Sequence, residues 1–182
     1  MKRYNTTALN DIANYISGYS DGEGCFCISF SYRPVNIKVG WEIKPSFAVG
    51  QNYDRREVLD LMQQYFGCGF IRRDYGDKTL KFEVRGINDL LDRVIPHFRR
   101  FPLRSAKQKD FILFDTVCRK IKQGKHLEPR GIEEILKLAY QMNGSGKRKY
   151  PLEYMIAKIN SDEDIVCAPR NRGMNMKFRR VE

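Results

Sequence analysis

The sequence predicts an α+β fold built around an antiparallel β-sheet. Apolar residues near the N-terminus recur every three or four positions, which is the spacing of one face of a helix. Beyond them the apolar period changes to two in four further segments, which is typical of strands with one buried face. The expected order is helix, two strands, helix, two strands and then further helices.

The first helix is expected over residues 8–20, where apolar side chains lie at helical spacing. Residues 26–33 alternate between apolar and polar or small side chains, and residues 41–49 do the same after a turn at residues 34–36. The two alternating segments therefore predict a long hairpin.

A second unit of helix and hairpin follows. Asp54 has the type and position of an N-cap, and the helix after it is expected to close at Gly67 and Gly69. Residues 70–75 and 78–85 alternate on either side of a glycine-containing turn, which predicts a second, shorter hairpin.

The rest of the domain is expected to be helical. A short helix over residues 88–95 is expected to stop at Pro96. Ser105 is expected to cap a longer helix that runs to Ile121, and Pro129 to begin another that stops near residue 143.

The charge of the chain points to a polyanionic partner. It has 182 residues, 33 Lys and Arg against 22 Asp and Glu, and a net charge of +11. Nucleic acid is the first expectation and an anionic membrane surface the weaker one. Residues 1–143 are expected to form one domain and residues 144–182 a basic extension.

Neither a bilayer-spanning apolar run nor a signal peptide is evident in the sequence. An intracellular location is therefore expected, in the cytoplasm of a prokaryote or inside an organelle. The five cysteines do not have zinc-ligand spacing, which also favours a reducing compartment. His97 and His126 stand alone, and a helix-terminal or surface role is expected for them rather than a catalytic one.

The outward rows of the predicted sheet are polar and biased towards cations, which suits a nucleic-acid groove. Strand ribbons enter the DNA major groove, and strands of about ten residues at ~3.3 Å each would span roughly ten base pairs. A merely solvated face is the alternative, and it explains the polarity but not the positive charge.

Two acids, Asp21 and Glu23, lie among glycines where the first helix is expected to end. Carboxylates are disfavoured at the negative C-terminus of a helix unless a cation is present, and a metal ion is the obvious candidate. Gly18 and Gly22 lie four apart on one stripe of the same helix. This stripe could be a contact between two helices, or the glycines could simply end the helix.

Residues 16–24, ISGYSDGEG, resemble the motif of the LAGLIDADG homing endonuclease family. Residues 47–51 (FAVGQ) before Arg55, and residues 98–103 (FRRFPL) before Lys107, resemble downstream segments of that family. The resemblance covers about residues 8–143. It implies the LAGLIDADG fold, with an α-β-β-α-β-β-α core and a saddle-shaped antiparallel DNA-binding sheet.

The resemblance also implies the roles of the site residues. Glu23 would be the catalytic metal ligand, and Gly22 would lend a backbone carbonyl to the metal. Gln51 would position the nucleophilic water, while Arg55 and Lys107 would supply positive charge near the scissile phosphate. Lys109 remains an alternative to Lys107. Asp21 is expected to cap or orient the neighbouring helix end.

A single copy of the motif implies a homodimer with two-fold symmetry. The interface would include Gly18, Tyr19, Asp21 and Gly22, and each sheet would read one half of a target of about twenty base pairs. The implied reaction is Mg²⁺-dependent hydrolysis of both DNA strands to leave short 3′ overhangs, by an enzyme encoded in a group I intron. Mn²⁺ would substitute, and Ca²⁺ would support binding without cleavage. Membranes and small-molecule substrates are not expected.

Thirteen positions match the rows of the family that face the groove. They are Cys27, Ser29, Ser31, Arg33, Glu42, Lys44, Ser46, Ala48, Phe70, Arg72, Asp74, Thr79 and Lys81.

Two competing functions remain open. The same scaffold could serve as an RNA-binding maturase without cleavage activity, or as a DNA-binding protein with no chemistry. Retention of Glu23, Gln51 and Arg55 favours the nuclease.

Overall fold

The computed structural model describes residues 6–33, 40–74, 79–144, 146 and 148–161. It confirms the α+β fold and the expected order of elements. The elements are α1 (Thr6–Glu23), β1 (Gly24–Tyr32), β2 (Trp41–Asn52), α2 (Glu57–Phe66), β3 (Phe70–Asp74), β4 (Thr79–Val84), α3 (Ile87–Asp89), the π-helical segment η1 (Leu90–Val94), α4 (Ile95–Arg100), α5 (Lys107–Lys122), the 3₁₀ turn η2 (Lys125–Leu127), α6 (Pro129–Ala139) and α7 (Leu152–Ser161).

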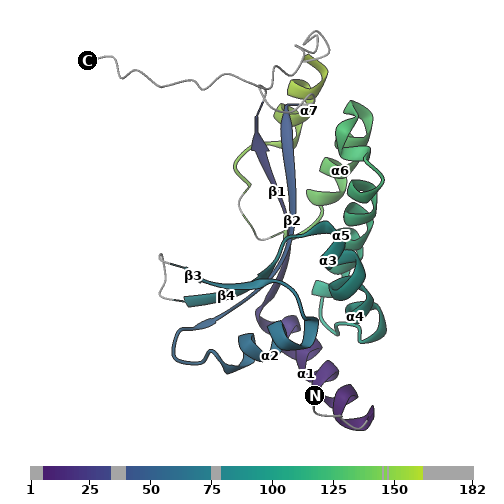
Figure 1. Cartoon of the computed structure of the whole chain (residues 1–182). Coiled ribbons are helices and arrows are strands. Elements are labelled where there is room, and N and C mark those ends of the chain that lie inside the picture. Colours follow the sequence, from purple (N-terminus) through teal and green to yellow (C-terminus); the bar gives the residue numbers. More distant parts are fainter. Residues whose placement is uncertain (1–5, 34–39, 75–78, 145, 147, 162–182) are drawn as a thin grey trace, which may run out of the picture.

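The four strands form one curved sheet in the order β1-β2-β4-β3 (Figure 1). Every neighbouring pair is antiparallel, and Phe26 of β1 lies opposite Phe47 of β2, which lies opposite Val84 of β4. The register therefore puts the apolar rows of both hairpins on one face, as the alternation predicted.

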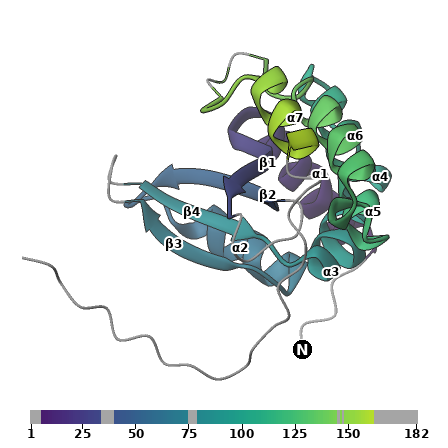
Figure 2. The same ribbon diagram turned by 90° about the horizontal axis from the view of Figure 1, so that it is seen from above.

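The main core lies between this face and the helices, which cover one side of the sheet (Figure 2). Its centre is a group of fully buried aromatic rings, in which Phe26 stacks on Phe47 at 5.1 Å and meets Phe98 edge-on at 5.2 Å. Rings in such contact gain from their geometry as well as from burial. Because the rings come from β1, β2 and α4, this packing fixes the helices over the sheet.

Two helix boundaries differ from the sequence-based predictions. The second helix begins at Glu57 rather than after Asp54, because Asp54 lies in a turn that Arg55 closes by donating its amide to Asn52 at 3.0 Å. The helix expected to stop at Pro96 continues to Arg100.

The π-helical segment explains why Pro96 is tolerated. Leu90–Val94 forms one wide turn, and Pro96 occupies the first turn of the α-helix that follows it. The amide of Ile95 bonds to the carbonyl of Leu90, five residues back, and this wider turn leaves room for the Pro96 ring, which would clash with a carbonyl in a regular α-helix.

A second, smaller core lies at the far end of the β1–β2 hairpin. Trp41 packs there with Ile132 and Leu136 of α6 and with Met155 and Ile159 of α7. The first part of the expected basic extension therefore packs on the rest of the protein, and residues after 161 lie outside the described part. The division into a domain and an extension remains a prediction.

The free edge of β1 is covered by the segment that follows α6. Asn143 donates its side-chain amide to the carbonyl of Phe26 at 2.9 Å, and Arg148 donates to the carbonyl of Ile28 at 3.3 Å. These contacts satisfy edge carbonyls that would otherwise invite another strand. No described helix has the length and apolar character needed to cross a bilayer.

His97 is buried in the last turn of α4 and bonds to two other helices, so of the two expected roles the helix-terminal one holds and the surface one is wrong. Its Nε2 lies 3.1 Å from Ser17 Oγ of α1, and its Nδ1 lies 2.9 Å from the Tyr65 hydroxyl of α2. Ser17 donates its own proton to the Phe101 carbonyl, so it accepts from Nε2–H while Tyr65 donates to Nδ1. Burial lowers the pKa of His97 to about 4.

We expect the free energy of unfolding to fall as the pH is lowered from 6.5 to about 4. The unfolded state binds a proton near the ordinary pKa of 6.5, whereas the pKa of the folded imidazole is about 4. The stability is fully present above 6.5 and declines by up to roughly 3 kcal/mol across this window. Urea unfolding between pH 4 and 7.5 measures it.

A His97→Gln variant should lose this part of the pH dependence, whereas His126→Gln should keep it. An identical pH slope in the wild type and His97→Gln would contradict the assignment.

Candidate functional site

The last turn of α1 runs directly into β1. Glu23 ends the helix and is exposed, and Gly24 begins the strand. A Cβ on Gly24 would lie 2.5 Å from the carbonyl oxygen of Ser20, so only glycine allows the strand to leave the helix this closely. The carbonyl end of α1 and the Glu23 carboxylate therefore lie at the start of the sheet.

Lys107 supplies the cation that this helix end needs. From the first position of α5, its ammonium donates to the carbonyls of Ser20 and Gly22, both at 3.1 Å. The positive charge compensates the negative end of the helix. Lys109 is exposed and donates no hydrogen bond to α1 within the described residues, so the geometry favours Lys107 over Lys109.

Asp21 holds the segment that leads into α5, so it orients the neighbouring helix end rather than capping it. Its carboxylate accepts from the backbone amides of Arg104 and Ser105, both at 2.9 Å, and from the Ser105 hydroxyl. Ser105 Oγ in turn accepts from the Lys107 amide at 3.1 Å. Burial works to raise the pKa of Asp21, but the hydrogen bonds from Ser105 and Arg104 outweigh it and the pKa is lowered.

Gln51 and Arg55 reach the same region from the end of β2. The Gln51 amide donates to the Tyr19 hydroxyl, and its oxygen accepts from the Asn52 amide at 2.6 Å. Tyr19 lies one turn before Glu23 on α1. Burial raises the pKa of Tyr19; the Gln51 bond and the charge of Arg55 act against this rise, and the charge of Glu23 adds to it. The phenol is therefore neutral and holds the Gln51 side chain in place.

The structure thus brings Glu23, Gln51 and Lys107 to the C-terminal part of α1, and Arg55 lies close enough for its charge to act on Tyr19. Sequence reasoning placed Tyr19 in the dimer contact and missed its bond to Gln51, because that bond joins residues 32 positions apart.

The oxygen donors at this helix end suit a hard divalent cation. They are the Glu23 carboxylate and the carbonyls of Ser20 and Gly22, which Lys107 also contacts. Among the described residues there is no cluster of three or more His, Cys, Asp or Glu that could hold a metal ion. Mg²⁺ needs only one or two carboxylates when waters and phosphate oxygens fill its shell. The donor set therefore fits an ion shared with a phosphate.

Gly18 and Gly22 form part of an exposed stripe on α1. The helix continues for five residues past Gly18, so Gly18 does not end it, whereas Gly22 lies in its last turn. A Cβ at either position would meet no other atom within 4 Å, so nothing within the described chain requires glycine there. An open cavity lies beside the stripe, lined by Asn14, Ser17, Gly18, Asp21 and residues 100–104.

The thirteen positions predicted to face a groove lie on or beside the polar face of the sheet. Within the strands, the register pairs Cys27 with Ser46, Ser29 with Lys44, Ser31 with Glu42, Gly50 with Lys81, and Arg72 with Lys81. Several of these side chains are ion-paired: Glu42 contacts Arg33 at 2.7 Å and Lys44 at 3.0 Å, and Lys81 contacts Asp74 at 2.5 Å.

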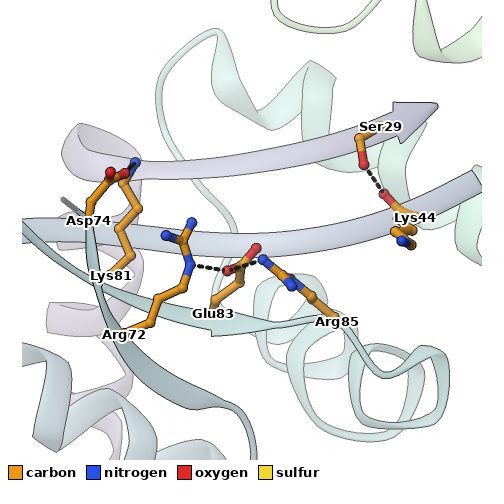
Figure 3. A network of polar contacts seen from close by, with 7 residues as sticks. All are labelled: Ser29, Lys44, Arg72, Asp74, Lys81, Glu83 and Arg85. Atoms are coloured by element: carbon orange, nitrogen blue, oxygen red, sulfur yellow. Dashed lines mark hydrogen bonds and ion pairs between the residues drawn. The ribbon is translucent and has the colours of Figure 1, made fainter. Parts of the chain in front are cut away.

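Two further charged residues belong to this face and were absent from the predicted set. Glu83 lies between Arg72 and Arg85, and both arginines contact its carboxylate (Figure 3). The outward position of Glu83 and Arg85 agrees with the alternation of residues 78–85, but alternation contains no information on which arginines share the acid.

Comparisons with known proteins agree with the resemblance that residues 16–24 suggest. The sequence model described as LAGLIDADG endonuclease matches residues 16–118. An archaeal intron-encoded homing endonuclease, I-Vdi141I, solved in complex with DNA, has a TM-score of 0.78 and 26% sequence identity, with 85% of this chain and 98% of that chain covered.

Among curated proteins, the homing endonuclease I-ApeII of Aeropyrum pernix is 26% identical over 160 residues, which is 85% of this chain and 93% of that protein. A protein of Neurospora crassa named probable intron-encoded endonuclease 2 is 28% identical over 158 residues, which is 84% of this chain and 35% of that protein. The chain thus spans about a third of the length of this fungal relative.

We expect Asp21→Ala to lower the free energy of unfolding by about 1 kcal/mol, because it leaves the backbone amides of Arg104 and Ser105 without their acceptor. Urea unfolding at pH 7 measures the change. Asp92→Ala, at an exposed carboxylate of the helical layer, is the matched control and should cost less. Equal costs for the two variants would show that the bonds from Arg104 and Ser105 to Asp21 contribute nothing.

Proposed function

The chain belongs to the LAGLIDADG endonuclease family, and on that premise we propose that it is a site-specific homing endonuclease. It would act as a homodimer and hydrolyse both strands of a long pseudo-palindromic DNA target. The observation that carries this proposal is the position of Glu23, exposed at the end of α1 beside Gln51 and Lys107.

DNA binding is supported by the polar face of the sheet and by the net charge of +11. At ~3.3 Å per residue, the 9 residues of β1 and 12 of β2 span about 30–40 Å, which is roughly the length of ten base pairs. Each sheet would read one half-site through the thirteen positions named above.

The dimer is supported by the glycine stripe of α1. Two such helices could approach closely at Gly18 and Gly22, with Tyr19 and Asp21 beside the contact. A two-fold axis there would place the Glu23 of one chain at one DNA strand and the Glu23 of the other chain at the other strand. Both strands would then be cut.

Glu23 and the Gly22 carbonyl would hold Mg²⁺, or Mn²⁺ in its place, with Ca²⁺ supporting binding alone. When bound, the ion supplies activation of water and stabilisation of the leaving oxygen. Gln51, held by Tyr19, orients the attacking water, while Arg55 and Lys107 place positive charge near the phosphate. Short 3′ overhangs would result.

The names of the relatives support an origin within an intron, and with it a location in an organelle or in a prokaryotic cytoplasm. The proximity of Gln51 and Lys107 to the helix end that carries Glu23 favours cleavage over RNA-binding maturase activity without cleavage.

We expect Glu23→Gln to reduce cleavage by at least about 100-fold, because it removes the charged metal ligand. DNA affinity should stay within a few-fold, because the sheet is unaffected. Cleavage of duplex DNA in Mg²⁺ and binding in Ca²⁺ measure the two effects. Glu134→Gln, on an exposed carboxylate that pairs with Lys120, is the matched control and should cleave normally. Undiminished nicking by Glu23→Gln would refute the role.

We expect light scattering to report twice the chain mass of 21.4 kDa. Gly18→Leu should convert the protein to a monomer, because a Cβ at this position meets no atom of the chain, whereas a leucine would separate two closely packed helices. Its helix should be at least as stable, since glycine inside a helix costs about 1 kcal/mol relative to good helix formers. A Gly18→Leu protein that remained dimeric would contradict the proposed interface.

A further inference from the structure

Glu83 is a buried acid on the face that is proposed to meet DNA. It lies in β4, opposite Ala48 of β2 and Phe70 of β3, and its side chain is only 7% exposed. Burial of a carboxylate is unfavourable without partners, and the phosphates of DNA would repel it. A generally cationic DNA-binding surface therefore does not explain why an acid is buried at this position.

Two arginines compensate the charge of this carboxylate. Arg72 Nε and Arg85 Nη2 both donate to the same oxygen, Oε2 of Glu83, at 2.8 Å (Figure 3). Burial works to raise the pKa of Glu83, but the bonds from Arg85 and Arg72 outweigh it and the pKa is lowered. Glu83 is thus ionised at neutral pH, and it offsets the repulsion between two adjacent guanidinium groups.

The atom that each arginine uses determines what it can still bind. Arg72 donates to Glu83 through Nε. Its two Nη groups have no hydrogen-bond acceptor among the described residues. These groups form the planar fork that matches O6 and N7 of a guanine in the major groove. Arg85 is held on a second side by Phe70, whose ring centroid lies 5.4 Å from its guanidinium carbon.

We propose that Glu83 is a positioning residue for base recognition, which orients Arg72 before DNA arrives so that Arg72 reads one guanine in each half-site. Arg85 donates to the same Glu83 oxygen and packs on the Phe70 ring, so it is held on the other side of Glu83 from Arg72. The inference rests on the proposed DNA-binding function and names a specificity determinant for it. A side chain held in its bound conformation loses less entropy on binding, so the preference for guanine is sharpened.

A purely structural salt bridge would have different consequences. Loss of a stabilising bridge would weaken binding equally at all positions of the target, whereas loss of an oriented Arg72 changes the preference at one position. The position-resolved base preference therefore separates the two roles.

The test is selection of bound duplexes from a randomised library in Ca²⁺ by the full chain. The wild type should require guanine at one position of each half-site, and Arg72→Ala should abolish that requirement. Glu83→Gln should weaken it about tenfold at the same position and leave the other positions unchanged. The double variant should have the profile of Arg72→Ala. Glu134→Gln, on the helical side, should match the wild type.

Circular dichroism establishes whether each variant folds. If Glu83→Gln does not, Glu83→Asp serves instead, because its shorter carboxylate keeps the charge but cannot reach both arginines. A wild-type profile in the folded variant, or an equal loss at every position, would overturn the role of Glu83. Absence of any sequence preference in the wild-type protein would overturn the proposed function as well.

Discussion

The junction between α1 and α5 is the constraint on which the proposed chemistry depends. Two carboxylates at the C-terminal end of a helix oppose its dipole, and the fold resolves this through two different contacts. Lys107 places an ammonium on the carbonyls of Ser20 and Gly22, while Asp21 turns away to accept from the amides of Arg104 and Ser105, just before α5. Glu23 is thereby left as the exposed acid, on a helix end that is fixed from two sides.

The sheet shows the same principle of holding functional side chains in place through neighbours. Its core face is sealed by aromatic packing, so the alternation of the strands turns the charged residues to the other face. There the cations are paired with acids rather than left isolated, as in the groups around Glu42, Asp74 and Glu83. Pairing limits their movement, which suits the reading of bases better than the neutralisation of phosphates.

Patterns local in the chain predicted the parts of the fold that are determined locally. The change of period after Gly24 identified the first helix and hairpin, and the αL conformation of Gly67 closes α2 as expected. The prediction at Pro96 was wrong because a π-helical turn, which no local pattern signals, removes the conflict with proline. The contacts that hold Gln51 and Glu83 come from neighbouring elements, and a single sequence does not indicate such pairs.

The central claim is that the α1 ends of two chains meet and present their Glu23 carboxylates to divalent ions at the scissile phosphates. A crystal structure of the protein with an uncleaved target duplex and Ca²⁺ tests it most directly. We expect the two Glu23 side chains to face each other across a two-fold axis, each about 2.3–2.6 Å from a bound Ca²⁺. Glu23 residues far from the axis, or directed away from the duplex with the ions bound elsewhere, would contradict it.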